Sequence, residues 1–80
     1  MEWIKCTDRL PKINSSGYKS DPVLVIFKSE DGTIDYRVDT YIVEHYHRIE
    51  SYRWNRQKKR KGFREDYLAW MPIPEYKDGE

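Results

Sequence analysis

The strongest structural signal in the chain begins at Val23, where residues 23–39 read Val-Leu-Val-Ile-Phe-Lys-Ser-Glu-Asp-Gly-Thr-Ile-Asp-Tyr-Arg-Val-Asp. The uninterrupted β-branched and aromatic run at its start is typical of a strand buried on both faces or of a short buried helix. Its short length and its Val and Ile content favour the strand. Gly32 supplies the positive φ that a tight turn requires, and apolar and polar residues alternate after it. The segment therefore predicts a β-hairpin.

The pattern continues beyond this hairpin with one interruption. The second strand is expected over residues 33–43, but the alternation slips around Thr40 and Tyr41, where we expect a bulge or a bend. Residues 44–50 fit a helical spacing as well as a strand spacing, and we interpret them as a turn. That turn leads into a third long strand over residues 49–55.

The two ends of the chain predict shorter elements. Residues 3–6 are apolar enough for an edge strand, and residues 12–21 are rich in loop formers. We expect a last strand over residues 67–71, stopped by Pro72 and the second proline that follows it. The polar residues 75–80 are expected to fray.

Residues 53–64 form the most unusual part of the sequence, reading Arg-Trp-Asn-Arg-Gln-Lys-Lys-Arg-Lys-Gly-Phe-Arg. They hold seven of the fifteen basic side chains and no acid, whereas elsewhere eight bases face fourteen acids, a balance of −6. Because the run ends at Gly62, residues 56–62 should form the tip of a second hairpin that protrudes from the domain. Such a block stays solvated and raises the local concentration of anionic partners.

The chain of 80 residues predicts a single domain over residues 1–80, because a second core would lack apolar area. Its three Trp, seven Tyr and two Phe supply large core side chains, among them Trp70. The expected fold class is mainly β, with α+β as the alternative: a small antiparallel sheet of four to five strands with a protruding basic hairpin. The edge strand at 3–6 can pair with a copy of itself, so a homodimer is an alternative to a monomer.

The cellular setting is inferred from what the sequence does not contain. Cys6 is the single cysteine, so no internal disulfide can form. The chain shows no signal peptide and no apolar run of membrane-spanning length. We therefore expect a soluble cytoplasmic protein that does not enter a membrane.

Three segments carry a further signal. They are Met1-Glu2-Trp3-Ile4 with Asp8-Arg9-Leu10-Pro11, then Pro22-Val23-Leu24-Val25, and finally Trp70-Met71-Pro72-Ile73-Pro74-Glu75. Together they resemble a family of small phage and prophage proteins, unknown-function domain family 551, whose members close on Trp-Met-Pro-Leu-Pro-Glu. The resemblance implies a compact sheet-based protein in the cytoplasm of a bacterial host, and it supplies no catalytic residue. The chain departs from the family in its long basic region and at Ala69, where many members have His.

The basic segment is the main candidate site. Cations interleaved with aromatic rings can combine phosphate neutralisation with base stacking, as single-strand binders do. An acidic protein surface is the other candidate partner, and a solvated loop without a partner is the third interpretation. A net charge of +1 argues against a dedicated duplex binder. The candidate contact residues are Arg53, Trp54, Arg56, Lys58, Lys59, Arg60, Lys61, Phe63 and Arg64.

These observations favour a non-catalytic phage accessory protein. Its expected partner is a host protein or ribonucleoprotein complex, such as a CRISPR or restriction assembly, that the protein inhibits through the basic arm. Direct binding of single-stranded nucleic acid or RNA is the first alternative. A small hydrolase using His45, His47 or Cys6 is the second, although so short a chain leaves little room for an enzyme pocket. The two histidines would share one face of a strand, but no further ligands complete a metal site, so we expect no metal and no cofactor.

Overall fold

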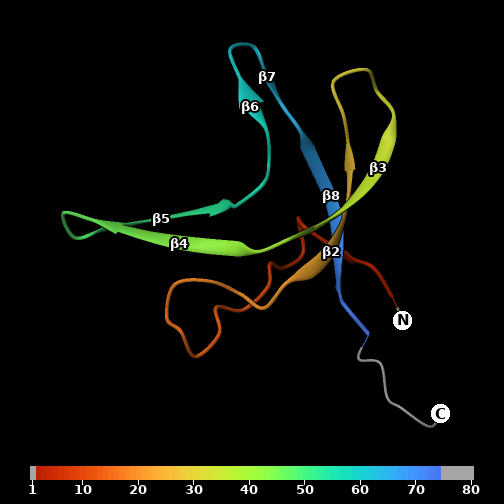
Figure 1. The fold of residues 1–80 in the computed structure, drawn as a ribbon. Helices are drawn as coiled ribbons and strands as arrows, with labels where there is room; N and C mark the ends of the chain where they lie inside the picture. The colour runs from red at the N-terminus through yellow and green to blue at the C-terminus, as the bar shows by residue number, and fades with distance from the viewer. Residues whose placement is uncertain (1, 75–80) are drawn as a thin grey trace, which may run out of the picture.

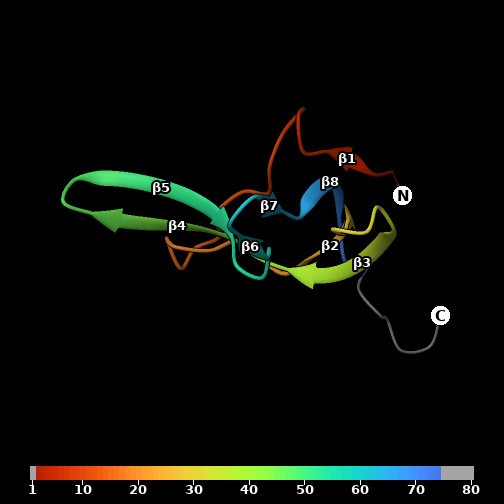
Figure 2. The ribbon, with the colours of Figure 1, turned by 90° about the horizontal axis from the view of Figure 1, so that it is seen from above.

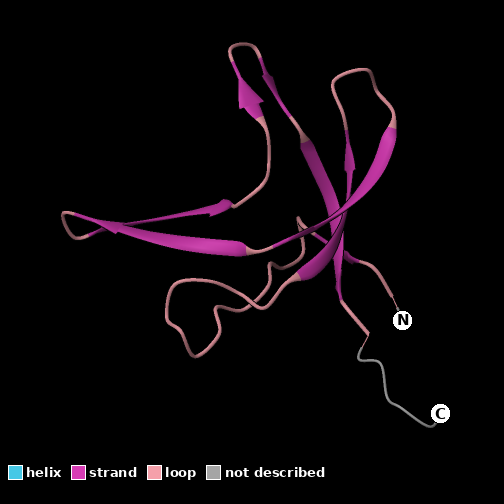
Figure 3. Cartoon of the chain, viewed as in Figure 1, coloured by secondary structure: helices cyan, strands magenta, loops and turns pink. Residues whose placement is uncertain are grey.

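The computed structural model describes residues 2–74, which form eight β-strands and no helix (Figures 1 and 3). The strands are β1 (Ile4–Lys5), β2 (Val23–Lys28), β3 (Ile34–Asp39), β4 (Tyr41–Tyr46), β5 (Ile49–Trp54), β6 (Lys59–Arg60), β7 (Phe63–Arg64) and β8 (Asp66–Pro72). They make a four-stranded sheet in the order β1-β8-β2-β3 and two separate two-stranded hairpins, β4-β5 and β6-β7, with every pairing antiparallel. The mainly β fold is confirmed, but β4, β5, β6 and β7 pair outside the main sheet.

The hairpin predicted around Gly32 is confirmed as β2 and β3. Its register pairs Val23 with Asp39 and Lys28 with Ile34, and Gly32 occupies the turn with a φ of 86°. The expectation that β2 is buried on both faces is wrong. Val23, Val25 and Phe27 are buried, whereas the alternate residues are only partly covered, because no element among residues 2–74 lies over that second face.

Aromatic side chains from three strands build the core on the covered face of the sheet. Trp54 of β5 lies with its ring centroid 5.1 Å from that of Tyr67, and Phe27 lies 5.7 Å from Tyr67. Trp70 is buried in the same cluster, as expected, and its indole Nε1–H donates to the carbonyl of Arg9 at 2.9 Å. The core therefore depends on few but large side chains, which suits a chain of this length.

The predicted interruption at Thr40 and Tyr41 is a corner between two sheets. β3 ends at Asp39, and the next strand pairs with β5 instead of continuing beside β2. The carbonyl of Thr40 accepts a hydrogen bond from the Asn55 amide at 3.0 Å, which ties the corner to the end of β5. The β4-β5 hairpin consequently projects from the main sheet, and the predicted third long strand is confirmed as β5 (Figures 1 and 2). The turn predicted over residues 44–50 is shorter than expected, because residues 44–46 continue β4 and only residues 47–48 connect the strands.

The edges of the main sheet are short or capped. On the outer edge of β3, the carboxylate of Asp35 accepts a hydrogen bond from the Tyr36 amide at 2.8 Å. The Arg56 guanidinium donates to the carbonyl of Val38 at 3.2 Å. At the opposite edge, the expected strand at residues 3–6 is confirmed as the two-residue β1. Capped backbone groups discourage pairing with another chain, and the homodimer stays a prediction.

The predicted loop over residues 12–21 contains no strand, yet it is attached to β4. Ser20 is buried, its Oγ accepts from the Tyr41 amide at 2.9 Å, and its own amide donates to the carbonyl of Tyr41 at 2.7 Å. The predicted tail, residues 75–80, lies outside the described residues.

Replacing Trp70 by Ala should lower the free energy of unfolding by about 3–5 kcal/mol, because it removes a large buried side chain and leaves a cavity. The measurement is urea unfolding followed by circular dichroism. Trp3→Ala is the matched control, since Trp3 is 40% exposed and should lose much less. Equal losses in the two variants would contradict the assignment of Trp70 to the core.

Candidate functional site

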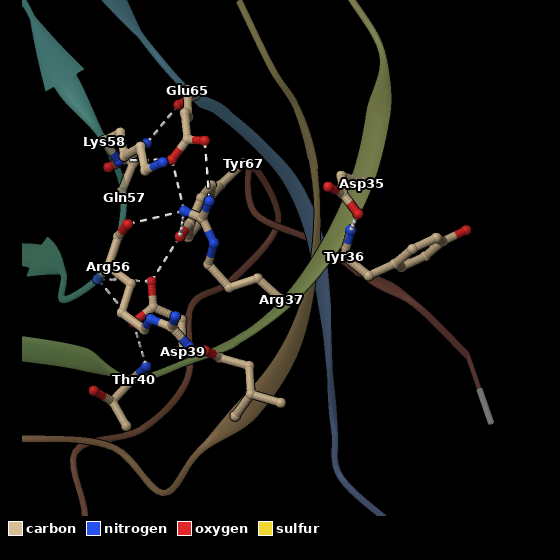
Figure 4. Close-up of polar contacts among 11 residues, drawn as sticks. Asp35, Tyr36, Arg37, Asp39, Thr40, Arg56, Gln57, Lys58, Glu65 and Tyr67 are labelled. Atoms are coloured by element: carbon tan, nitrogen blue, oxygen red, sulfur yellow. Dashed lines mark hydrogen bonds and ion pairs between the residues drawn. The ribbon is translucent and has the colours of Figure 1, made fainter.

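A buried ion pair lies at the base of the basic hairpin (Figure 4). Arg37 reaches from β3 across the ring of Phe27, with its guanidinium carbon 4.2 Å from the ring centroid. It donates to both carboxylate oxygens of Glu65, Nη1 to Oε1 at 2.6 Å and Nη2 to Oε2 at 3.1 Å. Burial alone would raise the pKa of Glu65, but the hydrogen bonds from Arg37 and from the Lys58 amide lower it. Glu65 is therefore a charged carboxylate that is only 5% exposed.

Asp39 is a second buried carboxylate beside the first, and it is 2% exposed. It accepts a hydrogen bond from the Tyr67 hydroxyl at 2.6 Å and one from the Thr40 amide at 2.7 Å. The Arg56 amide donates to both of its oxygens, at 3.0 and 2.9 Å. Burial, followed by the hydrogen bond to Asp39, raises the pKa of Tyr67, so its hydroxyl remains a donor.

These two carboxylates fix both legs of the hairpin to the body. On the incoming leg, the Lys58 amide donates to Glu65 Oε1 at 2.7 Å, and the carbonyl of Arg56 accepts from Arg37 at 2.8 Å. The two legs are joined directly, because the Glu65 amide donates to the carbonyl of Lys58 at 3.0 Å and the Gln57 amide group donates to the carbonyl of Glu65 at 2.7 Å. The hairpin thus leaves the body in a defined direction.

The hairpin itself confirms the predicted turn at Gly62, which has a φ of 81°. β6 and β7 pair Lys59 with Arg64 and Arg60 with Phe63. Lys59 and Arg64 therefore occupy one face, directly opposite each other across the ladder. Like charges at such a pair of positions repel one another.

The nine predicted contact residues fall into distinct groups. Arg53 pairs with Glu44 at 2.7 Å, and Arg60 pairs with Glu30. Arg56 is used in the fold through its amide and its guanidinium. Within residues 2–74, the remaining four cations have no carboxylate within ion-pair distance; they are Lys58, Lys59, Lys61 and Arg64.

The two predicted aromatic anchors need correction. Trp54 is 6% exposed and packs in the core against Tyr67, so its ring is not available to a partner. Phe63 is half-buried and lines a cavity together with Glu30, Lys58, Lys59 and Arg60. Trp54 is the last residue of β5 and the buried one in that strand, because it reaches the core where the hairpin joins the body.

A groove of about 230 Å³ runs between β5 and the face of the hairpin that carries Lys59 and Arg64. Arg53 also lines it, so three cations from β5, β6 and β7 line the groove. The acids Glu65 and Asp66 lie along the same groove, and Glu65 is already neutralised by Arg37.

Tyr52 is a groove residue that lies outside the predicted set. It is 51% exposed, and its ring stacks on that of Tyr41 with centroids 5.8 Å apart and planes at 15°. Tyr41 in turn contacts Trp54 edge-on at 5.2 Å. One end of this aromatic stack is anchored in the core, and at the other end Tyr52 is exposed, with its hydroxyl donating to Glu50 at 3.1 Å. Tyr52 and Trp54 are two positions apart on β5 and therefore lie on the same face of the strand. This spacing is the sequence pattern that indicates Tyr52 as a site residue.

The residues suggested for hydrolysis are not brought together. The amide of Cys6 donates to Leu68 of the main sheet at 3.1 Å, whereas the two histidines lie at the end of the projecting β4-β5 hairpin (Figures 1 and 2). The expectation that His45 and His47 share a strand face is wrong, because β4 ends before His47, which lies in the turn with a φ of 48°. Burial, and then the charge of Asp66, raises the pKa of the Cys6 thiol, which disfavours the nucleophilic thiolate. Among residues 2–74, no three potential ligand side chains gather in a metal-binding arrangement.

Fold and site together define a small antiparallel β protein with a clamped cationic hairpin. Residues 2–76 match the model of a family described as a protein of unknown function, DUF551, and the chain belongs to this family. No curated protein matches the chain. No solved structure matches it. Residues 2–74 include no helix with the length and apolarity needed to cross a membrane.

The clamp, formed by Arg37, Asp39, Glu65 and the amides of Arg56 and Lys58, predicts how stability depends on pH. Because the folded pKa of Glu65 is lower than the ordinary value of 4.5, its contribution is complete above that pH and is lost as the pH falls through the folded value. Glu65→Gln should cost about 3 kcal/mol near neutral pH, since Arg37 loses its partner, and should flatten the acid dependence. Urea unfolding at about pH 7 and about pH 4 measures both effects.

The control for this experiment is Asp31→Asn. Hydrogen bonds from Ser29 and Thr33 lower the pKa of the exposed Asp31 to about 2, so Asp31, like Glu65, makes the protein less stable as the pH falls. Asp31→Asn therefore measures the acid dependence that a carboxylate outside the clamp contributes. An unchanged pH profile in Glu65→Gln would contradict the role of Glu65 as the charged member of the clamp.

Proposed function

We propose that this protein is a non-catalytic binding protein that holds single-stranded nucleic acid, as carried by a nucleic-acid-handling complex of its host. The observation that carries the proposal is the pair of opposed cations, Lys59 and Arg64, on a rigidly based hairpin. Neither has a carboxylate partner within residues 2–74. A bound phosphate between them would replace a repulsion with two charge-assisted contacts.

The groove beside the hairpin supports a strand in preference to a duplex. Its volume of about 230 Å³ suits a narrow backbone more than an enclosed ligand. Arg53, which is paired with Glu44, also lines it from β5, so a strand lying in it would meet basic side chains from β5 and from the hairpin. The acidic remainder of the chain would repel the wider charged surface of a duplex.

Tyr52 supplies the second element of single-strand recognition. Its exposed ring can extend the existing stack on Tyr41 by one base, and stacking of this kind is tolerant of sequence. The negative face of an aromatic ring does not attract carboxylates, whereas a base stacks on it. Tyr52 is therefore the feature that favours nucleic acid over an acidic protein as the partner.

The biological setting is part of the same proposal. The resemblance to phage and prophage proteins supports an accessory role in an infected bacterium. Binding the nucleic acid of a CRISPR or restriction assembly through these cations would inhibit that defence. The raised pKa of the Cys6 thiol supports a binding role in preference to a hydrolytic one.

The test is a salt titration of binding to a labelled single-stranded oligonucleotide of about 15 nucleotides, followed by fluorescence anisotropy. Affinity should fall steeply with salt for the wild type. Lys59→Gln/Arg64→Gln should weaken binding and reduce the slope of log affinity against log salt by about 1.4, which corresponds to two lost phosphate contacts.

Arg9→Gln/Lys12→Gln is the matched control, because it also removes one Arg and one Lys, both of them outside the residues that line the groove. It should leave the slope unchanged. Equal slopes for the wild type and Lys59→Gln/Arg64→Gln would overturn the proposal. Equal displacement of the oligonucleotide by polyglutamate would assign the hairpin to an acidic protein partner instead.

A further inference from the structure

A further cavity lies apart from the basic hairpin, between the segment after β1, the residues that precede β2, and the end of β8. It has a volume of about 550 Å³, within the range of small-molecule sites. It shares only Leu10 with the groove described above. The buried side chains in its lining are Pro11, Ser20, Val23 and Trp70.

The fixed polar groups of this cavity are already satisfied within the protein. The Ser20 hydroxyl donates to the carbonyl of Asp21 at 2.9 Å and accepts from the Tyr41 amide. The Trp70 indole donates to the carbonyl of Arg9, and Asn14 donates to Asp21 Oδ1 at 3.0 Å. The Ser20 hydroxyl and the Trp70 indole are therefore already used within the protein and are not free to bind the polar part of a ligand.

Prolines remove further donors. Pro11, Pro22 and Pro72 line the cavity, and proline has no backbone N–H. An extended peptide relies on main-chain hydrogen bonds from its site, and these positions cannot donate them. The lining therefore disfavours a peptide and favours a compact apolar group.

Two cations in the lining can provide charged contacts to a ligand. The exposed side chains of Arg9 and Lys12 line the cavity, and neither has a carboxylate within ion-pair distance among residues 2–74. Asp21 is the one acid of the lining, so the opening has an excess of positive charge. A ligand that is apolar for most of its length and anionic at one end complements this arrangement.

We propose that this cavity binds a small amphipathic monocarboxylic acid, with its apolar body against Val23, Trp70 and Ile73 and its carboxylate between Arg9 and Lys12. Charge-assisted hydrogen bonds hold the anionic end, and Asp21 opposes a second negative charge on the ligand. The site is independent of the proposed nucleic-acid groove, so either can fail without the other.

The experiment titrates the ¹⁵N-labelled full chain with octanoate and, separately, with 1-octanol, and follows amide and indole resonances by NMR. Octanoate should shift the Trp70 indole Nε1–H and the Val23 amide, and 1-octanol should bind at least roughly ten-fold more weakly. Arg9→Gln/Lys12→Gln should reduce octanoate affinity to the level of 1-octanol. Lys59→Gln/Arg64→Gln carries the same charge change and should bind octanoate like the wild type.

Three results would overturn the proposal. The first is equal binding of octanoate and 1-octanol, which would exclude a role for the cations. The second is the absence of shifts at Trp70, or shifts confined to Trp3 on the open face of the sheet. The third is tighter binding of a short peptide with a free carboxyl terminus, which would assign the cavity to a peptide partner.

Discussion

The fold depends on two buried carboxylates, Asp39 and Glu65, which would be strongly destabilising if they lacked partners. The structure satisfies both within one network. Arg37 forms a two-pronged pair with Glu65, and the amides of Arg56 and Lys58 complete the two acceptor sets. Because these donors come from β3 and from the leg of the basic hairpin, satisfying the carboxylates also joins these elements. The network therefore holds β3 and the basic hairpin together at this end of the sheet.

The same network separates two kinds of basic residue. Arg37 and Arg56 are used in hydrogen bonds within the protein, where they support the fold. Lys59 and Arg64 stand beyond the clamp, on a hairpin whose base cannot turn freely, and they face a groove that also contains Tyr52. A flexible basic tail would attract anions equally well but would not place two cations and an aromatic ring in fixed relation. This placement is the physical basis of the proposed specificity for a single strand.

Sequence patterns predicted the local elements better than their assembly. The hairpin at Gly32 and the hairpin at Gly62 followed from residue types, and the alternation located the corner at Thr40. The pairing of β4 with β5 was harder to foresee, because its turn uses His47 and Arg48 at positive φ instead of Gly or Asn. The clamp was missed because it joins residues far apart in sequence. For the same reason, nothing in the sequence indicated that the three family-like segments line one cavity.

Amide hydrogen exchange at the base of the basic hairpin tests the clamp most directly. The amides of Arg56 and Lys58 donate to buried carboxylates, so they should exchange slowly, like core amides of β2, although both residues are exposed. The amides of Lys61 and Gly62 at the tip should exchange quickly. Rapid exchange at Arg56 and Lys58, equal to that at the tip, would contradict the account, because the cations would then be carried on a flexible loop.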